Sequence, residues 1–231
     1  MNILSIDTAT DIASVAILKD TKLLGEINLN IKNSHSMVIM DMIIYILKTL
    51  ELTLEDIYGI VVSKGPGSFT GLRIGISTAK GICHGSNKPI IGISSLDSLA
   101  FGAMYFNGKI VPILNALREN VYTCIFKNIE GSLNKLTDYM FISVYDLKNL
   151  LKDEKDILFV GDAVNTYGDI LLNIFPNSTL CNNMFNYVKA SNLGILGMKS
   201  FKDGQKDDIE SFAPIYLKKS YAEEILEMEK K

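Results

Sequence analysis

Residues 2–29 read NILSIDTATDIASVAILKDTKLLGEINL, and apolar side chains alternate with polar or small ones through most of this stretch. The alternation breaks at residues 9–11 and again at residues 19–21. A period of two interrupted by short polar turns predicts three successive antiparallel strands. We expect a helix over residues 34–50 and a strand over residues 58–63 to follow, so the chain begins as a strand-strand-strand-helix-strand unit.

The rest of the chain repeats this mixture of strands and helices in a weaker form. We expect its elements at 69–85 (helix), 89–93 (strand), 95–104 (helix), 109–116 and 120–128 (strands), 144–151 (helix), 157–160 (strand), 164–174 (helix) and 190–201 (helix). Ser94, with Asp97 three residues later, resembles a capping box at the start of the third helix. The polar stretch 201–214 predicts a loop that returns toward the first half. This order predicts an α/β protein with two related lobes.

Length and composition limit the class of protein. With 231 residues, of which 48% are hydrophobic, the chain can bury a substantial core in one large domain or two small ones. We expect an N-terminal lobe at 1–104, completed by 214–231, and a second, smaller lobe at 105–213. The longest apolar run, residues 37–47, is shorter than the roughly 20 residues that span a bilayer. Because the N-terminus also lacks a signal-peptide pattern, we expect a cytoplasmic protein with no membrane contact.

Charge and reactive residues exclude several functions. A net charge of −3 argues against direct binding of nucleic acid by this chain alone, because such binding depends on clustered lysine and arginine. Three well-separated cysteines without CxxC spacing predict reduced thiols. Two lone histidines cannot supply the usual metal-ligand cluster, so we expect no metal site.

Residues 63–81, SKGPGSFTGLRIGISTAKG, have the glycine content of a phosphate-binding loop. The GxxxxGK[ST] motif needs a lysine that this stretch lacks at the required spacing, and the third glycine of GxGxxG is one place late at Gly71. Pro66 stands where the GxSxG nucleophile motif needs a glycine. We therefore expect the loop to be structural, forming a stiff entry into the helix that follows.

Two predicted helices have unusual faces. In helix 69–85, Gly71, Gly75 and Ala79 recur every four residues and leave a nearly bare face against which another backbone can lie. Helix 34–50 is apolar around most of its circumference and needs burial on more than one side. Packing within the protein's own core and contact with a second protein both remain open for these faces. If they bind a partner, Met40→Asp or Gly75→Arg should abolish binding and leave the fold largely intact.

Four stretches together resemble one known family. They are ILSIDTAT, SKGPGSFTGLRIGISTAKG, SSLDSLA and PIYLKKSYA, which occur in this order over most of the chain. They resemble the TsaB family, also called YeaZ, of bacterial tRNA threonylcarbamoyladenosine synthesis. The resemblance implies the two-lobed α/β fold of the actin, sugar-kinase and Hsp70 (ASKHA) superfamily, with mixed sheets flanked by helices.

The resemblance also implies a noncatalytic scaffold. In the family, the first two helices bind TsaD, the subunit that transfers threonylcarbamoyl to N6 of adenosine 37 in tRNAs reading ANN codons. The same surface closes a homodimer when TsaD is absent, the ATPase TsaE joins the pair, and tRNA is contacted only indirectly. The metal-binding HxxxH of TsaD is absent here, because Ile39 stands four places after His35. The partner-binding residues implied are Met37, Met40, Asp41, Ile44, Leu47, Gly71, Leu72, Gly75, Thr78, Ala79 and Ile82.

Two short stretches support an alternative function. DTAT, which begins at Asp7 and Thr8, and GDAVN at 161–165 resemble the phosphate loops of sugar kinases. The alternative is a small ASKHA-type ATP-dependent kinase or ATPase with Asp7 and Thr8 as cofactor-binding residues, although such residues commonly just fix a turn by hydrogen bonds. The resemblance itself implies no cofactor required by this chain and at most weak nucleotide binding in the complex. Asn115 stands where the family often has an aspartate.

Overall fold

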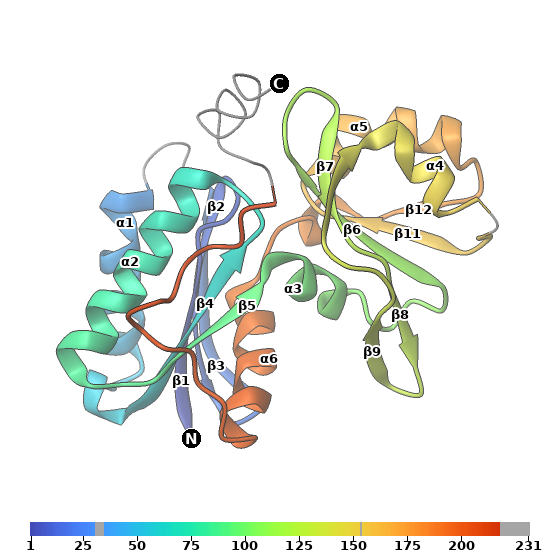
Figure 1. The fold of residues 1–231 in the computed structure, drawn as a ribbon. Coiled ribbons are helices and arrows are strands. Elements are labelled where there is room, and N and C mark those ends of the chain that lie inside the picture. Colours follow the sequence, from blue (N-terminus) through green and yellow to red (C-terminus); the bar gives the residue numbers. More distant parts are fainter. Residues whose placement is uncertain (31–34, 153, 218–231) are drawn as a thin grey trace.

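The computed structural model describes residues 1–30, 35–152 and 154–217 and shows two lobes side by side (Figure 1). The first lobe contains a five-stranded sheet in the order β3-β2-β1-β4-β5. Its elements are β1 (Asn2–Asp7), β2 (Ile12–Lys19), β3 (Lys22–Asn30), α1 (His35–Thr49), η1 (Leu54–Asp56), β4 (Ile57–Gly65), α2 (Phe69–Ser86), β5 (Ile90–Ser94) and α3 (Ser95–Gly102). The first three strands are antiparallel, and β4 and β5 run parallel to β1. The predicted strand-strand-strand-helix-strand unit is confirmed.

The second lobe repeats the topology of the first. Its sheet has the order β10-β7-β6-β11-β12, and β8 and β9 form a hairpin beside β6. The elements are β6 (Lys109–Asn115), β7 (Asn120–Thr123), β8 (Phe126–Ile129), β9 (Ser132–Lys135), β10 (Met140–Ser143), η2 (Val144–Asp146), α4 (Leu147–Leu150), β11 (Ile157–Val160), α5 (Ala163–Ile174), β12 (Thr179–Leu180), η3 (Asn183–Phe185) and α6 (Ala190–Lys202). Without the β8–β9 hairpin, three antiparallel strands are again followed by two parallel ones. The prediction of two related lobes is therefore confirmed.

Two local predictions need correction. The strand expected over residues 120–128 is interrupted after Thr123, where the Ile125 N–H turns to the Thr137 hydroxyl at 3.0 Å, and continues as β8. Ser94 does cap α3, accepting a hydrogen bond from the Leu96 N–H at 3.2 Å. Asp97 does not complete a capping box, because its carboxylate instead accepts hydrogen bonds from the Tyr139 hydroxyl at 2.8 and 2.9 Å.

Helix α6 lies in the segment 105–213 that the sequence assigns to the second lobe, but it packs on the first sheet. Its glycines explain this position, since a Cβ on Gly194 or Gly197 would clash with Leu18 or Val61. The chain after α6 also stays with the first lobe. Asp207 accepts a hydrogen bond from the Gly92 N–H at 2.7 Å, which confirms the predicted return of the 201–214 loop. Residues 214–217 lie against the first lobe as well, and 218–231 fall outside the described residues.

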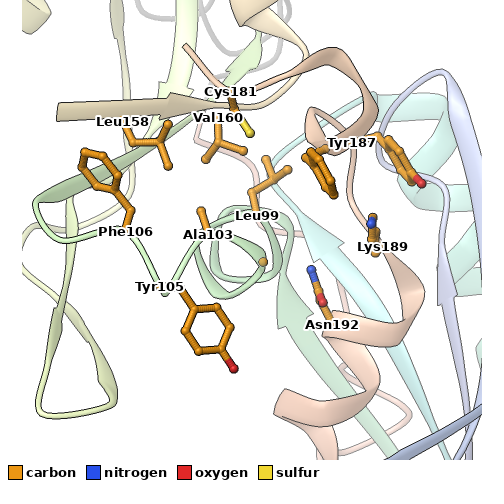
Figure 2. A pocket seen from close by; sticks show the side chains of 12 residues that line it. Leu99, Ala103, Tyr105, Phe106, Leu158, Val160, Cys181, Tyr187, Lys189 and Asn192 are labelled. Carbon is orange, nitrogen blue, oxygen red and sulfur yellow. The ribbon is translucent and has the colours of Figure 1, made fainter. Parts of the chain in front are cut away.

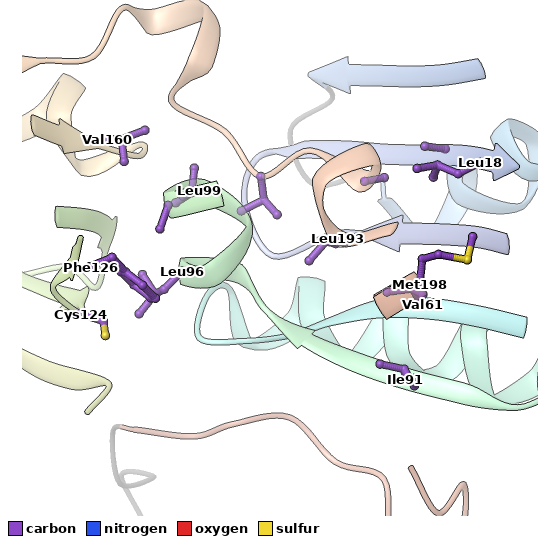
Figure 3. Close-up of a cluster of buried hydrophobic side chains, with 14 of the residues drawn as sticks. Leu18, Val61, Ile91, Leu96, Leu99, Cys124, Phe126, Val160, Leu193 and Met198 are labelled. Carbon is purple, nitrogen blue, oxygen red and sulfur yellow. The ribbon is translucent and has the colours of Figure 1, made fainter. Parts of the chain in front are cut away.

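One hydrophobic core joins the lobes (Figure 3). Helices α3 and α6 lie between the two sheets, where Leu96, Leu99 and Leu193 meet Val61 of β4 and Val160 of β11. Two further cores lie on the outer faces, one under α1 and α2 and one under α4 and α5. Strands β1, β2, β4 and β11 are thus buried on both faces of their sheets. Within the described residues, no helix combines the length and apolar character needed to cross a bilayer.

Candidate partner-binding face and interlobe cleft

Helix α1 buries one side and exposes an apolar surface on the other. Ile39 and Ile43 are 1% and 2% exposed and pack toward the first sheet. In contrast, Met37, Ile44 and Tyr45 are 76%, 57% and 65% exposed. Apolar side chains all round the helix therefore serve two surfaces, one internal and one open to solvent.

The predicted site residues of α1 divide between these surfaces. Met37, Met40, Asp41 and Ile44 are exposed, as a contact with a second protein requires. Leu47 is only 8% exposed and belongs to the core under α1 and α2. Tyr45, which the sequence reasoning missed, completes the exposed set.

The predicted small-residue face of α2 points inward. Gly71, Gly75 and Ala79 are buried, and so is Leu72 at 1% exposure. A Cβ on Gly71 would clash with the Thr8 carbonyl oxygen, and a Cβ on Gly75 would clash with the Thr8 hydroxyl oxygen. The residue that lies close to this face is therefore Thr8, directly after β1, and these residues cannot form the partner surface while α2 stays in place.

This geometry also corrects the expected effect of Gly75→Arg. A long side chain at Gly75 would have to displace Thr8, whose hydroxyl donates to the Gly71 carbonyl at 2.7 Å. That substitution disrupts the fold and cannot test binding alone. Met40, which is 43% exposed, remains suitable for that purpose.

A second stripe of small residues on α2 faces outward. Ser77, Gly81 and Gly85 are exposed, and a Cβ added to either glycine would have no heavy atom within 4 Å. The sequence carries a signal that separates the two stripes, because Arg73 and His84 flank this one whereas apolar residues flank the buried one. Of the predicted residues, Thr78 and Ile82 are half-buried at the border of this exposed stripe.

The two helices leave grooves between them. One groove, of about 410 Å³, is apolar and is lined by Met40, Ile43, Ile44, Leu47, Lys48, Leu52, Leu54 and Ile82. A second, of about 520 Å³, is lined by Ser36, Phe69, Thr70, Arg73, Ile74, Ser77 and Thr78. We call the exposed apolar residues of α1, the open glycines of α2 and the two grooves between these helices the α1–α2 face.

The glycine loop before α2 holds the turn after β1. The Ser68 N–H donates to the Ala9 carbonyl at 2.7 Å, and Thr8 is 2% exposed. Asp7 is fully buried, with the Ala9 N–H donating to its Oδ1 at 3.3 Å and no partner for Oδ2 within the described residues. Burial raises the pKa of Asp7 to about 7, an effect that the Ala9 hydrogen bond partly offsets. The loop therefore covers Thr8 and Ala9, whereas Thr10, the last residue of the DTAT turn, lines a cleft between the lobes.

A cleft of about 350 Å³ separates the loops that follow β1 and β11. Its lining includes Asp11 and Asp162, with no lysine or arginine among the described residues that line it. Burial, together with the charge of Asp11, raises the pKa of Asp162 to about 6, although the Asn115 N–H bonded to it at 2.8 Å acts in the opposite direction. A nucleotide's phosphates would find no lysine or arginine among these described residues, so they would have to be held through Mg²⁺, for which the two carboxylates are suitable ligands. Within the described residues, histidine, cysteine and acidic side chains form no group of three that could hold a metal ion.

Comparison with known proteins agrees with this architecture. A family model described as "TsaD: tRNA N6-adenosine threonylcarbamoyltransferase" matches residues 22–226. The tRNA threonylcarbamoyladenosine biosynthesis protein TsaB of Bacillus subtilis (strain 168) is 29% identical over 225 residues, 96% of each chain. TsaB of Escherichia coli (strain K12) is 37% identical over 138 residues, 58% of each chain.

Solved structures confirm the fold. The structure described as YeaZ from Pseudomonas aeruginosa has a TM-score of 0.78 at 22% identity and covers 94% of this chain and 99% of its own. The activator of the 2-hydroxyisocaproyl-CoA dehydratase from Clostridium difficile with bound ADPNP has a TM-score of 0.52 at 11% identity, covering 90% of this chain and 99% of its own. The fold is thus the two-lobed ASKHA type, and the chain belongs to the TsaB (YeaZ) family.

Proposed function

We propose that this chain is a noncatalytic accessory subunit that binds TsaD through the α1–α2 face and supports the synthesis of threonylcarbamoyladenosine. In this proposal TsaD transfers threonylcarbamoyl to N6 of adenosine 37 in tRNAs reading ANN codons, and TsaE joins the pair. The relatives named as tRNA threonylcarbamoyladenosine biosynthesis proteins support the pathway. The same face would close a homodimer when TsaD is absent, and tRNA would be contacted only indirectly.

The observation that carries the proposal is the composition of the α1–α2 face. Met37, Ile44 and Tyr45 are each more than half exposed, and contiguous apolar surface of this kind marks interaction sites. Gly81 and Gly85 support the same conclusion, because glycine within a helix costs about 1 kcal/mol relative to alanine and nothing in the described chain packs against them. Close approach of a partner helix would explain both features.

The cleft between the lobes does not by itself decide between an accessory subunit and an enzyme. Asp11 and Asp162 line it, and no lysine or arginine is among its described lining residues, so a nucleotide would need Mg²⁺ held by those carboxylates. Asp7, the acid at the end of β1, is fully buried. The accessory role therefore rests on the α1–α2 face.

The alternative function, a small ATP-dependent kinase or ATPase, has one observation in its favour. Asp7 Oδ2 is buried without a hydrogen-bond partner in the described chain, and such an orphaned oxygen could accept a ligand if the turn opened. Mg²⁺-dependent ATP turnover by the isolated chain would establish the alternative. The absence of turnover in the same assay, with product in the reconstituted system below, would exclude it.

The decisive experiment is a drop-out reconstitution with the cognate partner proteins and tRNA. We expect threonylcarbamoyladenosine to form only when this chain is present. Ile44→Asp should weaken the affinity for TsaD by ~100-fold or more, because burying an unpaired carboxylate at the interface costs ~3 kcal/mol or more. The loss should be visible as reduced copurification with TsaD. Leu172→Asp is the matched control, since Leu172 is 40% exposed on α5 of the other lobe. Equal product without the chain would refute the accessory role, and equal copurification of the two variants would refute the proposed face.

A further inference from the structure

A cavity of about 370 Å³ lies where the two lobes meet, apart from the α1–α2 face (Figure 2). We propose that it binds a small amphipathic anion, namely a molecule with an apolar body and a single carboxylate or sulfonate. The lining comes from both lobes and includes Leu99 and Ala103 of α3, Leu158 and Val160 of β11, and Cys181 and Lys189. The volume is within the range typical of small-molecule sites, roughly 300–1,000 Å³.

The walls of the cavity are apolar and rigid. Figure 2 shows Leu158, Val160 and Cys181 on one side and Leu99 and Ala103 opposite them. Leu99 and Val160 are each 2% exposed and belong to the core that joins the lobes. Leu99 and Val160 are held by close packing in this core, so the apolar part of the cavity that they line is preformed and suits an apolar body.

The polar end of the cavity carries a positive charge. The Lys189 ammonium lies 5.0 Å from the ring centroid of Phe185 and 5.5 Å from that of Tyr187. No carboxylate in the described part of the chain lies within ion-pair distance of Lys189. A cation flanked by aromatic rings and free of a charged partner can accept an anion, whereas it repels a cationic ligand.

Neighbouring hydrogen bonds fix this polar end. The Lys189 carbonyl accepts from the Ser98 hydroxyl at 3.2 Å and from the Leu193 N–H at 3.2 Å. Asn192, which also lines the cavity, donates from Nδ2 to the Ser98 carbonyl at 3.1 Å. Helix α3 therefore holds the start of α6, and the ammonium is presented at one end of the apolar space. Because the positive charge lies at one end and the apolar wall at the other, a ligand with an apolar body and an anionic end matches the cavity.

One cysteine reports on occupancy of the cavity. Cys181 is half-buried in the cavity wall, whereas Cys83 and Cys124 are 1% and 0% exposed. Because alkylation needs an accessible thiol, iodoacetamide should modify Cys181 first. A ligand in the cavity should protect it.

The test uses 2-naphthoate as the probe and 2-naphthalenemethanol as its neutral counterpart, with binding to the full chain measured by calorimetry. We expect saturable binding of one naphthoate per chain, weaker binding of the alcohol, and protection of Cys181 from iodoacetamide followed by mass spectrometry. Lys189→Gln should weaken naphthoate binding about fivefold, the effect of one partly exposed charge contact. Lys199→Gln, which alters an exposed lysine on α6, the helix that Lys189 caps, should leave naphthoate binding unchanged.

A second variant fills the cavity. Ala103→Phe should abolish naphthoate binding, with circular dichroism verifying that the protein is folded. Equal affinity for naphthoate and the alcohol, or unchanged binding by Lys189→Gln, would overturn the proposed anion selectivity. Unchanged binding by a folded Ala103→Phe protein would overturn the site. If that variant does not fold, the alkylation rate of Cys181 in the unaltered chain tests the site. Equal rates of alkylation by iodoacetamide with and without saturating naphthoate would overturn the site.

Discussion

The same substitution at two glycines of α2 should have opposite effects on stability. Gly75→Ala places a methyl group against the Thr8 hydroxyl, whereas Gly81→Ala places one in open space. The two positions lie six residues apart on one helix, so differences in helix propensity largely cancel. The comparison therefore measures the packing of the buried stripe separately from the backbone effect.

The magnitudes follow from these surroundings. Gly81→Ala should stabilise the isolated chain by about 1 kcal/mol, the difference in helix propensity between the two residues. At Gly75 the same gain is offset by overpacking, which costs about 1–3 kcal/mol. A further cost of about 1–2 kcal/mol follows if the 2.7 Å bond from the Thr8 hydroxyl to the Gly71 carbonyl breaks. Gly75→Ala should therefore destabilise the chain by about 2 kcal/mol.

Thermal unfolding followed by circular dichroism can resolve this difference. For a chain of this size, a change of 1 kcal/mol shifts Tm by about 2–4 °C. We expect Gly81→Ala to raise Tm by about that amount and Gly75→Ala to lower it by about 4–8 °C. Measurements at two protein concentrations would separate these effects from self-association. A Gly75→Ala protein as stable as Gly81→Ala would refute the inward orientation of the 71/75/79 stripe.

The remaining predictions concern the buried acids and the cleft. The folded-state pKa of Asp7, about 7, lies above its ordinary value of 3.8, so the folded chain binds the extra proton and loses stability as pH rises from about 4 to 7. Urea titrations should show that the free energy of unfolding of Asp7→Asn rises relative to that of the wild type through this window. If the two free energies change in parallel with pH, the carboxyl is not buried there. Tyr139→Phe removes the hydroxyl that donates to the Asp97 carboxylate at 2.8 and 2.9 Å, and it should lower the free energy of unfolding by about 1–3 kcal/mol. Tyr105→Phe, at a ring 92% exposed, should leave Tm unchanged. Equal changes in Tm for the two variants would disprove the hydrogen bond between the lobes. Millimolar ATP without Mg²⁺ should not shift the Tm of the isolated chain, because the described lining of the cleft offers carboxylates and no lysine or arginine to the phosphates. A saturable rise in Tm that requires Mg²⁺ would favour the kinase alternative.

The sequence predicted the fold where one pattern persisted over a whole element. Alternation through residues 2–29 predicted β1, β2 and β3 because those strands are long and each face of their sheet packs against its own apolar core. In the second lobe β12 has two residues and β8, β9 and β10 have four each, too few to establish a period. The position of α6 could not be predicted from its neighbours in the chain, since it crosses to the first sheet.

The exposure of the α1–α2 face, which we propose binds a partner, was predicted only in part for a similar reason. Helical periodicity shows which residues share a face, but it does not show which face points inward. The stripes at 71/75/79 and 77/81/85 have the same spacing, and only the residues around them differ: Leu72 and Ile76 beside the buried stripe, Arg73 and His84 beside the exposed one. The exposed residues of α1 were easier to predict, because a helix apolar on nearly all sides has more surface than one sheet can cover.

The duplicated topology makes the two outer helical layers comparable, and they differ. At the position after the third strand, the first lobe has α1 with 15 residues, whereas the second has α4 with four. Among the described residues, the first lobe alone offers a long apolar helix beside an open small-residue stripe, which supports the proposal that a partner binds that repeat. This lobe is not separable, because α6 from the far end of the chain covers the inner face of its sheet, including Ile3 and Val61. A fragment ending near residue 104 would expose that face to water, so the α1–α2 face must be tested on the full chain.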